Sequence, residues 1–439
     1  MKQGSLTREV LRIAWPMVIS ELSDSLYSIA DTYFVSKVGT VALAAVGVGS
    51  YLAWLFFVIV ALFSIGVLVY AAQSYGAGEV KAARRALGES LVFGALVSFA
   101  ASVAVFYFTP SLISIITGPN PNLIEVAASY FRVRILGLPA LAAALMMDSV
   151  VRAVGATKYS MVAVVSSAFL NVVLDPILIF GLLGAPKLGV AGAALATVIS
   201  IAYMIPLEAY FLKKLSLTPV LSMRPAHVVK VVKVGAPAAL ERLVFSVGNN
   251  AYIAFIARCG NVALAAHQVG LRIESFIYMP GFAFSVAASA LVGQRVGAGE
   301  VVEGKRVGME AAKIATALMA VLGVAVALTA SYLVAPFSPS AEVAQLAAVY
   351  LVLAGLSEPG LALAMTLSGA IRGGGNTIVP LVINAAGLYA FRVAPAAFLT
   401  SIVGVVGAWL AMFADVYLRG IIFLVVYLRY FLKLVKKVV

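Results

Sequence analysis

The stretch Gln73-Ser-Tyr-Gly76-Ala-Gly78-Glu79-Val80 returns in the second half of the chain as Gln294-Arg-Val-Gly297-Ala-Gly299-Glu300-Val301, at an offset of 221. Three other pairs keep the chain order at offsets of 221, 220 and 215. They are Gly39–Ala45 with Gly260–Ala266, Arg152–Thr157 with Arg372–Thr377, and Gly189–Ala196 with Gly404–Ala411. Four ordered matches at a nearly constant offset indicate that the chain is an internal duplication.

Composition predicts that both copies lie in a membrane. Of the 439 residues, 63% are hydrophobic and only 11% are charged, and the mean hydropathy is +1.06. Soluble domains carry about 25% charged residues, so this chain has too few charges to cover a water-facing surface. Twelve mostly apolar stretches reach the ~20 residues that a spanning helix needs, and none alternates as barrel strands do. We predict an all-α integral membrane protein with twelve transmembrane helices in two pseudo-symmetric six-helix lobes.

The basic residues indicate the orientation. If both termini are cytoplasmic, 21 Lys and Arg residues fall in inside segments, and only Lys37, Lys187 and Arg258 fall in outside loops. This bias follows the positive-inside rule, so the net charge of +13 reflects membrane orientation and not a nucleic-acid surface. An offset of six helices preserves orientation, which makes the repeat parallel. We expect an N-lobe at 1–213 (helices 1–6), a cytoplasmic linker at 214–230 and a C-lobe at 231–439 (helices 7–12).

Catalytic and cofactor motifs are missing from the sequence. The single cysteine, Cys259, excludes an intramolecular disulfide, and His227 and His267 lack metal-ligand spacing. No phosphate-binding GxxxxGK[ST] motif and no nucleophile–base pair can be found. The N-terminus has no cleavage site after a short apolar core, so it predicts a retained first helix. We expect neither an enzyme nor a cofactor.

Four polar residues lie inside predicted helices of the first half. They are Asp31, Asn171, Asp175 and Thr197, and the second and third share a helix face. Their oxygens suit Na⁺ or protons, and all four would be the ligands if the ion is Na⁺. Hydrogen bonding between helices is the alternative, and it fits Thr197 better than Asp175, because acids rarely lie unpaired in spans. The equivalent positions of the second half, which carry no acid, are Tyr252, Phe391, Pro395 and Met412.

Other residues are candidates for a substrate cavity. Asp24 lies seven residues before Asp31, on about the same helix face, while Asp148 either lines that cavity or pairs with Arg152. The further candidates are Tyr27, Met161 and Glu274, and Met161 has core packing as its alternative. In the second half Glu358 is another candidate contact, and Asp415 and Arg419 have the spacing of a helical ion pair.

At this point the chain resembles the multidrug and toxic compound extrusion (MATE) transporters along nearly its full length. The resemblance rests on Pro16 with Asp31, Gln73-x-x-Gly76-Ala-Gly78, Asn171-x-x-x-Asp175-Pro176, Ala265-Ala-His267-Gln268, Arg272-Ile-Glu274-Ser, Met279-Pro-Gly281 and Arg372-Gly-Gly-Gly375-Asn-Thr377. It implies a V-shaped pair of lobes that exports organic cations in exchange for Na⁺ or H⁺ by alternating access.

The resemblance also assigns roles to residues. It implies an ion-coupling cluster of Asp31, Asn171, Asp175 and Thr197 with a tyrosine at Tyr130, and a bend of the first helix at Pro16. Some family branches carry another acid on the seventh helix. The corresponding stretch here, Phe245–Asn250, has none, and Glu241 lies one turn earlier.

Two other classes compete with this interpretation. A lipid-linked oligosaccharide flippase of the same superfamily would line its cavity with basic residues, whereas the first half has acids. A channel or structural membrane protein does not account for acids in one half alone. We therefore expect a multi-pass cell-membrane protein, a monomer, whose partners are small cationic amphiphiles and the lipid bilayer, with no nucleic acid.

Overall fold

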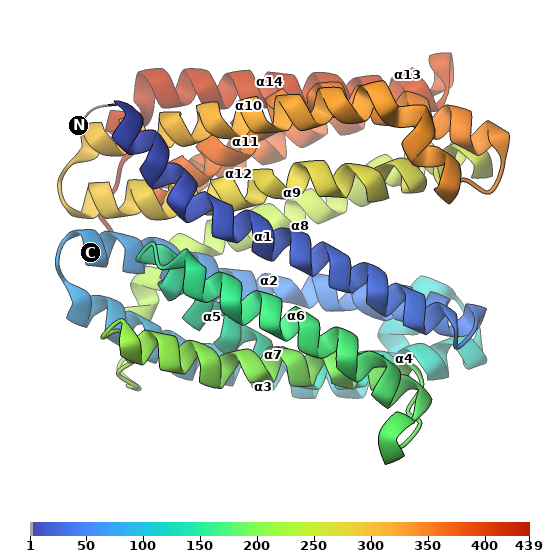
Figure 1. Cartoon of the computed structure of the whole chain (residues 1–439), viewed down its shortest axis with the longest axis horizontal. Coiled ribbons are helices and arrows are strands. Elements are labelled where there is room, and N and C mark those ends of the chain that lie inside the picture. Colours follow the sequence, from blue (N-terminus) through green and yellow to red (C-terminus); the bar gives the residue numbers. More distant parts are fainter. Residues whose placement is uncertain (1–2) are drawn as a thin grey trace. The chain divides into compact units, whose positions relative to one another are not determined.

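The computed structural model describes residues 3–439, and this part of the chain is helical, without β-strands. Long helices run roughly parallel to one another within each half (Figure 1). The α-helices are α1 Gln3–Ser36, α2 Thr40–Gly76, α3 Val80–Thr117, α4 Pro121–Leu136, α5 Leu138–Ala153, α6 Thr157–Phe180, α7 Val190–Lys214, α8 Val228–Arg258, α9 Asn261–Gly297, α10 Val301–Val334, α11 Ala341–Gly373, α12 Ile378–Gly387, α13 Ala394–Val403 and α14 Val405–Leu434. Short 3₁₀ turns, η1 Leu182–Gly184 and η2 Ala335–Phe337, follow α6 and α10.

Two pairs of these helices each form one interrupted helical segment. A 45° bend at Gly137 separates α4 from α5, and the π-helical turn η3, Leu388–Val393, joins α12 to α13. With each pair counted once, the described residues form the twelve long segments that the sequence predicts. Nine of them are apolar enough to cross a membrane on composition alone, the bent α4–α5 pair makes ten, and the more polar α1 and α8 fall short.

Many helices are longer than a bilayer requires. The 37 residues of α2 extend about 55 Å at a rise of 1.5 Å per residue, against a hydrocarbon core of about 30 Å. The ends of such helices therefore extend beyond a hydrocarbon layer of this thickness.

The repeated motifs mark equivalent turns. Gly78 and Gly299 lie in the α2–α3 and α9–α10 connections with φ of 76° and 83°, a left-handed conformation that glycine adopts without a side-chain clash. The other three motif pairs also place a positive-φ glycine at matching positions: Gly39 and Gly260, Gly155 and Gly375, Gly189 and Gly404. The sequence match between the two halves is therefore strongest at turns whose positive φ favours glycine.

Contacts between residues divide the chain into two compact units. One, here the first-half unit, contains residues 22–239, and the other, the second-half unit, contains residues 3–21 and 240–438. The beginning of α1 is thus grouped with the later helices, and the beginning of α8 with the earlier ones. The lobe boundaries expected from the sequence remain a prediction about which parts move together.

The connection between α7 and α8, residues 215–227, lies against α3. Arg84 Nε donates to the Thr218 carbonyl at 2.8 Å, and the Val220 N–H donates to the Arg84 carbonyl at 3.1 Å. A Cβ on Gly88 would overlap the Val220 carbonyl oxygen. The linker is therefore fixed to α3 by a glycine that lets two backbones touch.

Replacing Gly88 should detach this linker. In Gly88→Val the side chain would overlap the backbone of Val220, and backbone cannot swing aside as a flexible side chain can. We expect much faster chymotryptic cleavage after Leu221, which is 67% exposed within the linker. The matched control is Gly47→Val, because a Cβ at Gly47 meets nothing within 4 Å. Equal cleavage rates in the two variants would contradict the contact.

Candidate functional site

Two carboxylates of the first-half unit form the centre of the candidate site. Asp31 comes from the C-terminal half of α1 and is half-buried, whereas Asp175 on α6 is fully buried. The two lie within electrostatic range of each other. Within residues 3–439, Oδ1 of each carboxylate is buried without a hydrogen-bond partner. A bound proton or a hard cation would satisfy buried acceptors of this kind.

Asn171 and Thr197 complete the same cluster. The Asn171 side chain bonds Thr197 in either orientation of its amide. In the orientation that satisfies both of its ends, its nitrogen donates to Asp175 Oδ2 at 3.2 Å and its oxygen accepts from the Thr197 backbone N–H at 3.2 Å. Thr197 Oγ1 also donates to the Ala193 carbonyl at 3.0 Å. The i, i+4 spacing on α6 and the crossing of α7 therefore bring together three of the residues that the sequence singles out.

Tyr130 lies on the wall of this cluster. It is buried in α4 and packs with Val35, Val46 and Ile179, from α1, α2 and α6. Its hydroxyl shares a 3.2 Å hydrogen bond with Ser50 Oγ on α2, and its ring lies where a Cβ on Gly49 would sit. The structure thus places Tyr130 near the two acids, with α2 holding its position.

Arg134 is a neighbour that the sequence reasoning missed. It lies one turn after Tyr130 on α4, within electrostatic range of both Asp31 and Tyr130. Its Nε is buried without a hydrogen-bond partner among the described residues. A basic residue inside a predicted span was the available signal. Arg134 therefore partly offsets the negative charge of Asp31.

The other first-half candidates fall into two groups. Tyr27 lies beside the cluster, within range of Asp24, Asp31, Tyr130 and Arg134, and Asp24 is exposed on the same helix. Met161 is half-buried on α6, and Pro16 is buried within α1, which stays helical across it.

Asp148 belongs to a separate group near the end of α5. Its Oδ2 pairs with Arg152 Nε at 2.6 Å, which is the helical pairing that the sequence offered as one alternative. Arg152 Nε also donates to Ser160 Oγ at 3.0 Å, and the fully buried Glu208 of α7 faces Asp148. This paired group is distinct from the Asp31–Asp175 cluster.

The second-half unit uses its charges differently. The buried Asp415 binds Arg392 at 2.9 Å and Arg419 at 2.6 Å, so the spacing-based pairing of Asp415 with Arg419 matches the structure. Glu241 accepts from Arg372 Nη2 at 2.6 Å and from Asn384 Nδ2 at 2.7 Å. These acids are held by basic or amide partners.

Glu274 has a neutral partner instead. It is buried, and the Tyr350 hydroxyl donates a hydrogen bond to it. The His267 ring stands edge-on to Tyr350 at 4.9 Å between centroids, and the buried Glu358 lies within electrostatic range of Glu274.

In the second half, the position equivalent to Asp31 is Tyr252, a core residue whose hydroxyl donates to the Ala408 carbonyl at 2.9 Å.

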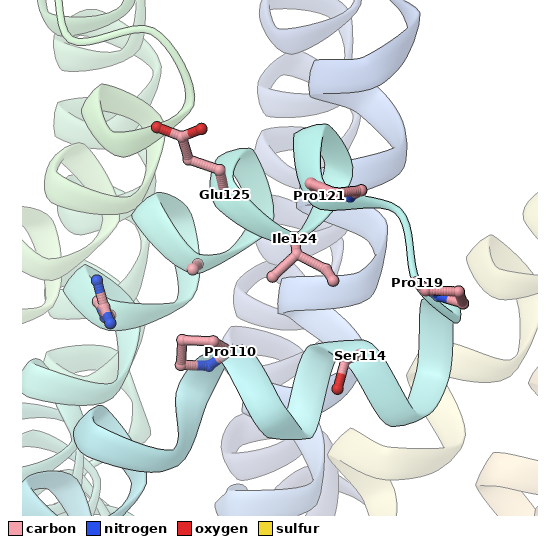
Figure 2. A pocket seen from close by; sticks show the side chains of 8 residues that line it. Pro110, Ser114, Pro119, Pro121, Ile124 and Glu125 are labelled. Atoms are coloured by element: carbon pink, nitrogen blue, oxygen red, sulfur yellow. The ribbon is translucent and has the colours of Figure 1, made fainter.

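A cavity of about 560 Å³ lies away from these residues. It opens between the C-terminal part of α3 and the start of α4, and Figure 2 shows Pro110 and Ser114 on one side with Pro121 and Ile124 on the other. None of the predicted site residues lines it. Residues 3–439 also contain no group of three or more His, Cys, Asp or Glu side chains arranged to hold a metal ion.

Comparison with known proteins identifies the family. The MatE family model matches residues 16–177 and again 237–398, so the two matches are related by the same offset of 221 as the sequence motifs. The chain therefore belongs to the MatE family of membrane transporters, and it is a multi-pass membrane protein.

Individual relatives agree over nearly the whole chain. A probable multidrug resistance protein NorM of Thermotoga maritima is 29% identical over 434 residues, covering 96% of this chain and 92% of that protein. An FAD transporter of Shewanella oneidensis is 26% identical over 420 residues, with coverages of 94% and 92%. A crystal structure of a mutant of the Vibrio cholerae MATE transporter VcmN superposes with a TM-score of 0.92 at 21% identity, covering 99% of this chain and 98% of that one.

Proposed function

We propose that this protein is a secondary active multidrug efflux transporter that exports organic cations in exchange for Na⁺ or H⁺. The coupling site would be the cluster of Asp31, Asn171, Asp175, Thr197 and Tyr130 in the first-half unit. The observation that carries the proposal is that Asp31 and Asp175 each leave a buried carboxylate oxygen unpaired. Relatives that are named as multidrug resistance proteins support the substrate class.

Within this proposal the residues have separate tasks. Asp31 and Asp175 would bind the coupling ion, and Asn171 would fix the orientation of Asp175 through its 3.2 Å hydrogen bond. Thr197 would add an oxygen, and Tyr130 would close one wall. Alternating access would result if ion binding to the cluster changed which side of the membrane the transporter opens to. Pro16 would let α1 bend during this change, because proline removes one hydrogen bond of the helix.

The acids also favour cationic substrates. Asp24, Tyr27 and Met161 supply a carboxylate, an aromatic ring and a polarizable thioether, which together attract amphiphilic cations. Glu274 and Asp148 would contribute to substrate binding only after their side chains rearrange, because both already have partners.

We further propose that the protein is a monomer. Both termini would lie in the cytoplasm, on the basis of the basic-residue asymmetry.

Ethidium efflux from proteoliposomes tests this function. Vesicles should be given a pH gradient alone, a Na⁺ gradient alone, both or neither. We expect one inward cation gradient to accelerate efflux and to identify the ion. No acceleration under any gradient would contradict the proposal, and movement of a lipid-linked oligosaccharide without ethidium would favour a flippase.

Arg134 should tune the affinity for that ion. Because its positive charge lies within range of Asp31, Arg134→Gln should strengthen cation binding and lower the half-saturating concentration of the coupling ion. Arg132→Gln is the matched control, since Arg132 is on the same helix but stacks over Phe106 at 5.2 Å. Unchanged half-saturation in Arg134→Gln would remove Arg134 from the site.

A further inference from the structure

A buried carboxylate of α3 binds the beginning of α8. Glu89 Oε2 accepts from the backbone N–H groups of His227 and Val228 at 2.7 and 2.9 Å, and Glu89 Oε1 contacts His227 Nδ1 at 2.7 Å. The first N–H groups of a helix have no partner within it and favour negative charge, so this contact satisfies two of them. Glu89 is only 2% exposed, which places the contact inside the first-half unit.

Close helix packing continues this attachment along α8. A Cβ on Gly66 of α2 would overlap the Val231 carbonyl oxygen, and a Cβ on Gly235 of α8 would overlap the Leu62 carbonyl oxygen. The His227 ring also lies edge-on to Tyr70 at 6.2 Å. The start of α8 is therefore held both by the carboxylate and by glycine-mediated contact with α2.

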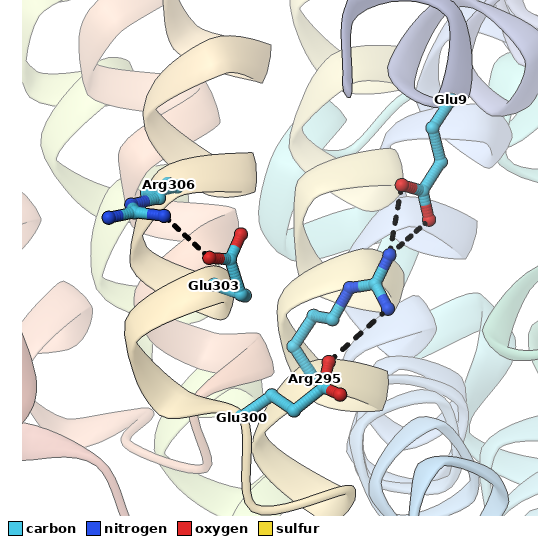
Figure 3. Close-up of polar contacts among 5 residues, drawn as sticks. All are labelled: Glu9, Arg295, Glu300, Glu303 and Arg306. Carbon is cyan, nitrogen blue, oxygen red and sulfur yellow. Dashed lines mark hydrogen bonds and ion pairs between the residues drawn. The ribbon is translucent and has the colours of Figure 1, made fainter. Parts of the chain in front are cut away.

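The repeat places a second carboxylate at the matching position. At the offset of 221 that relates the two halves, Glu89 corresponds to Glu310 of α10, and Val228 corresponds to Thr7 of α1. Thr7 Oγ1 donates to Glu310 Oε1 at 2.5 Å. Figure 3 shows the adjoining contact, in which Arg295 Nη2 of α9 binds both oxygens of Glu9 at 2.9 and 3.0 Å. The start of α1 is thus attached within the second-half unit.

We propose that Glu89 and Glu310 are a matched pair of positioning residues that hold the starts of α8 and α1 during transport. Each helix begins in one unit and continues in the other, since residues 3–21 of α1 and residues 228–239 of α8 group with the opposite half of the sequence. The carboxylates fix those starts, so a movement of either unit is passed along the helix. The effect on transport rests on the proposed function, whereas the attachment of the two helix starts can be measured independently of it.

Spin labels at the two helix starts test the pair. In a Cys259→Ser background, one label is placed at Ala226 before α8 and another at Arg8 of α1, both of which are exposed. We expect Glu89→Leu to mobilise the label at Ala226 and leave Arg8 unchanged, and Glu310→Leu to do the reverse. Glu89→Gln keeps one acceptor oxygen and should give an intermediate mobility at Ala226.

Controls separate positioning from general loss of structure. Glu79→Gln changes an exposed carboxylate at the start of the same α3 and should leave both labels unchanged. In transport, Glu89→Gln should lower the maximal rate severalfold with little change in substrate KM, because Glu89 is not part of the candidate site. Mobilisation of both labels by either variant, or no mobilisation in folded Glu89→Gln and Glu89→Leu, would overturn the proposal. A block of transport without any change in the labels would count against it as well.

Discussion

Asp175→Asn is expected to abolish gradient-driven ethidium efflux while the protein stays folded. The amide has nearly the same shape as the carboxylate and retains an oxygen for the 3.2 Å bond from Asn171. It cannot exchange a proton or balance a cation, so the coupling between ion and substrate should be lost. Asp31→Asn should have the same effect, because the unpaired oxygen on each acid would meet the ion.

Folding and function are measured separately for these variants. Removing an unpaired buried charge relieves a desolvation cost, so the thermal midpoint in detergent should not fall. Glu125→Gln is a suitable control, since Glu125 lies in the first turns of α4 and lines the separate cavity. Full efflux by both aspartate variants would exclude the proposed ion site, and a large fall in thermal midpoint would make the loss of transport a folding effect.

Asp415→Leu is expected to cause the largest loss of stability. The carboxylate lies between Arg392 and Arg419, and all three side chains are buried. Its removal would leave two guanidinium groups without their counter-charge. Breaking a buried ion pair from one side typically costs about 3–5 kcal/mol. We expect a strongly lowered thermal midpoint and aggregation in detergent.

The comparison variant is Glu303→Gln. Glu303 also pairs with an arginine, Arg306, at 2.6 Å, but the Arg306 side chain is 62% exposed. Exposed pairs contribute little, so this midpoint should change only slightly. If Asp415→Leu and Glu303→Gln behaved alike, the buried triad would not be a source of stability.

The duplication and the pairing of Asn171 with Asp175 on one helix face could be predicted because both depend on local sequence. Positive-φ glycines such as Gly78 and Gly299 keep their identity, and the spacing of Asn171 and Asp175 fixes a common helix face. Twelve apolar lengths then predict the fold class. The resemblance added Tyr130, which no spacing argument would have found.

Other features depend on contacts between distant residues. Gly88 touches Val220 and Glu89 binds His227, and neither pair leaves a pattern in the linker that connects the halves. The bend at Gly137 and the π-helical turn around Arg392 interrupt apolar runs that look continuous. Arg134 was overlooked because a lone basic residue gives no indication of which acid it will approach.

The exchanged helix beginnings suggest how the chain arose. Two identical six-helix proteins that each inserted their first helix into the other would form a domain-swapped homodimer, a known route to symmetric assemblies. Fusing the end of one copy to the beginning of the next would give one chain with residues 3–21 and 228–239 in exchanged places. On this view the segment 215–227 joins two former subunits, and halves produced as separate polypeptides should recognise each other through the arms they exchange.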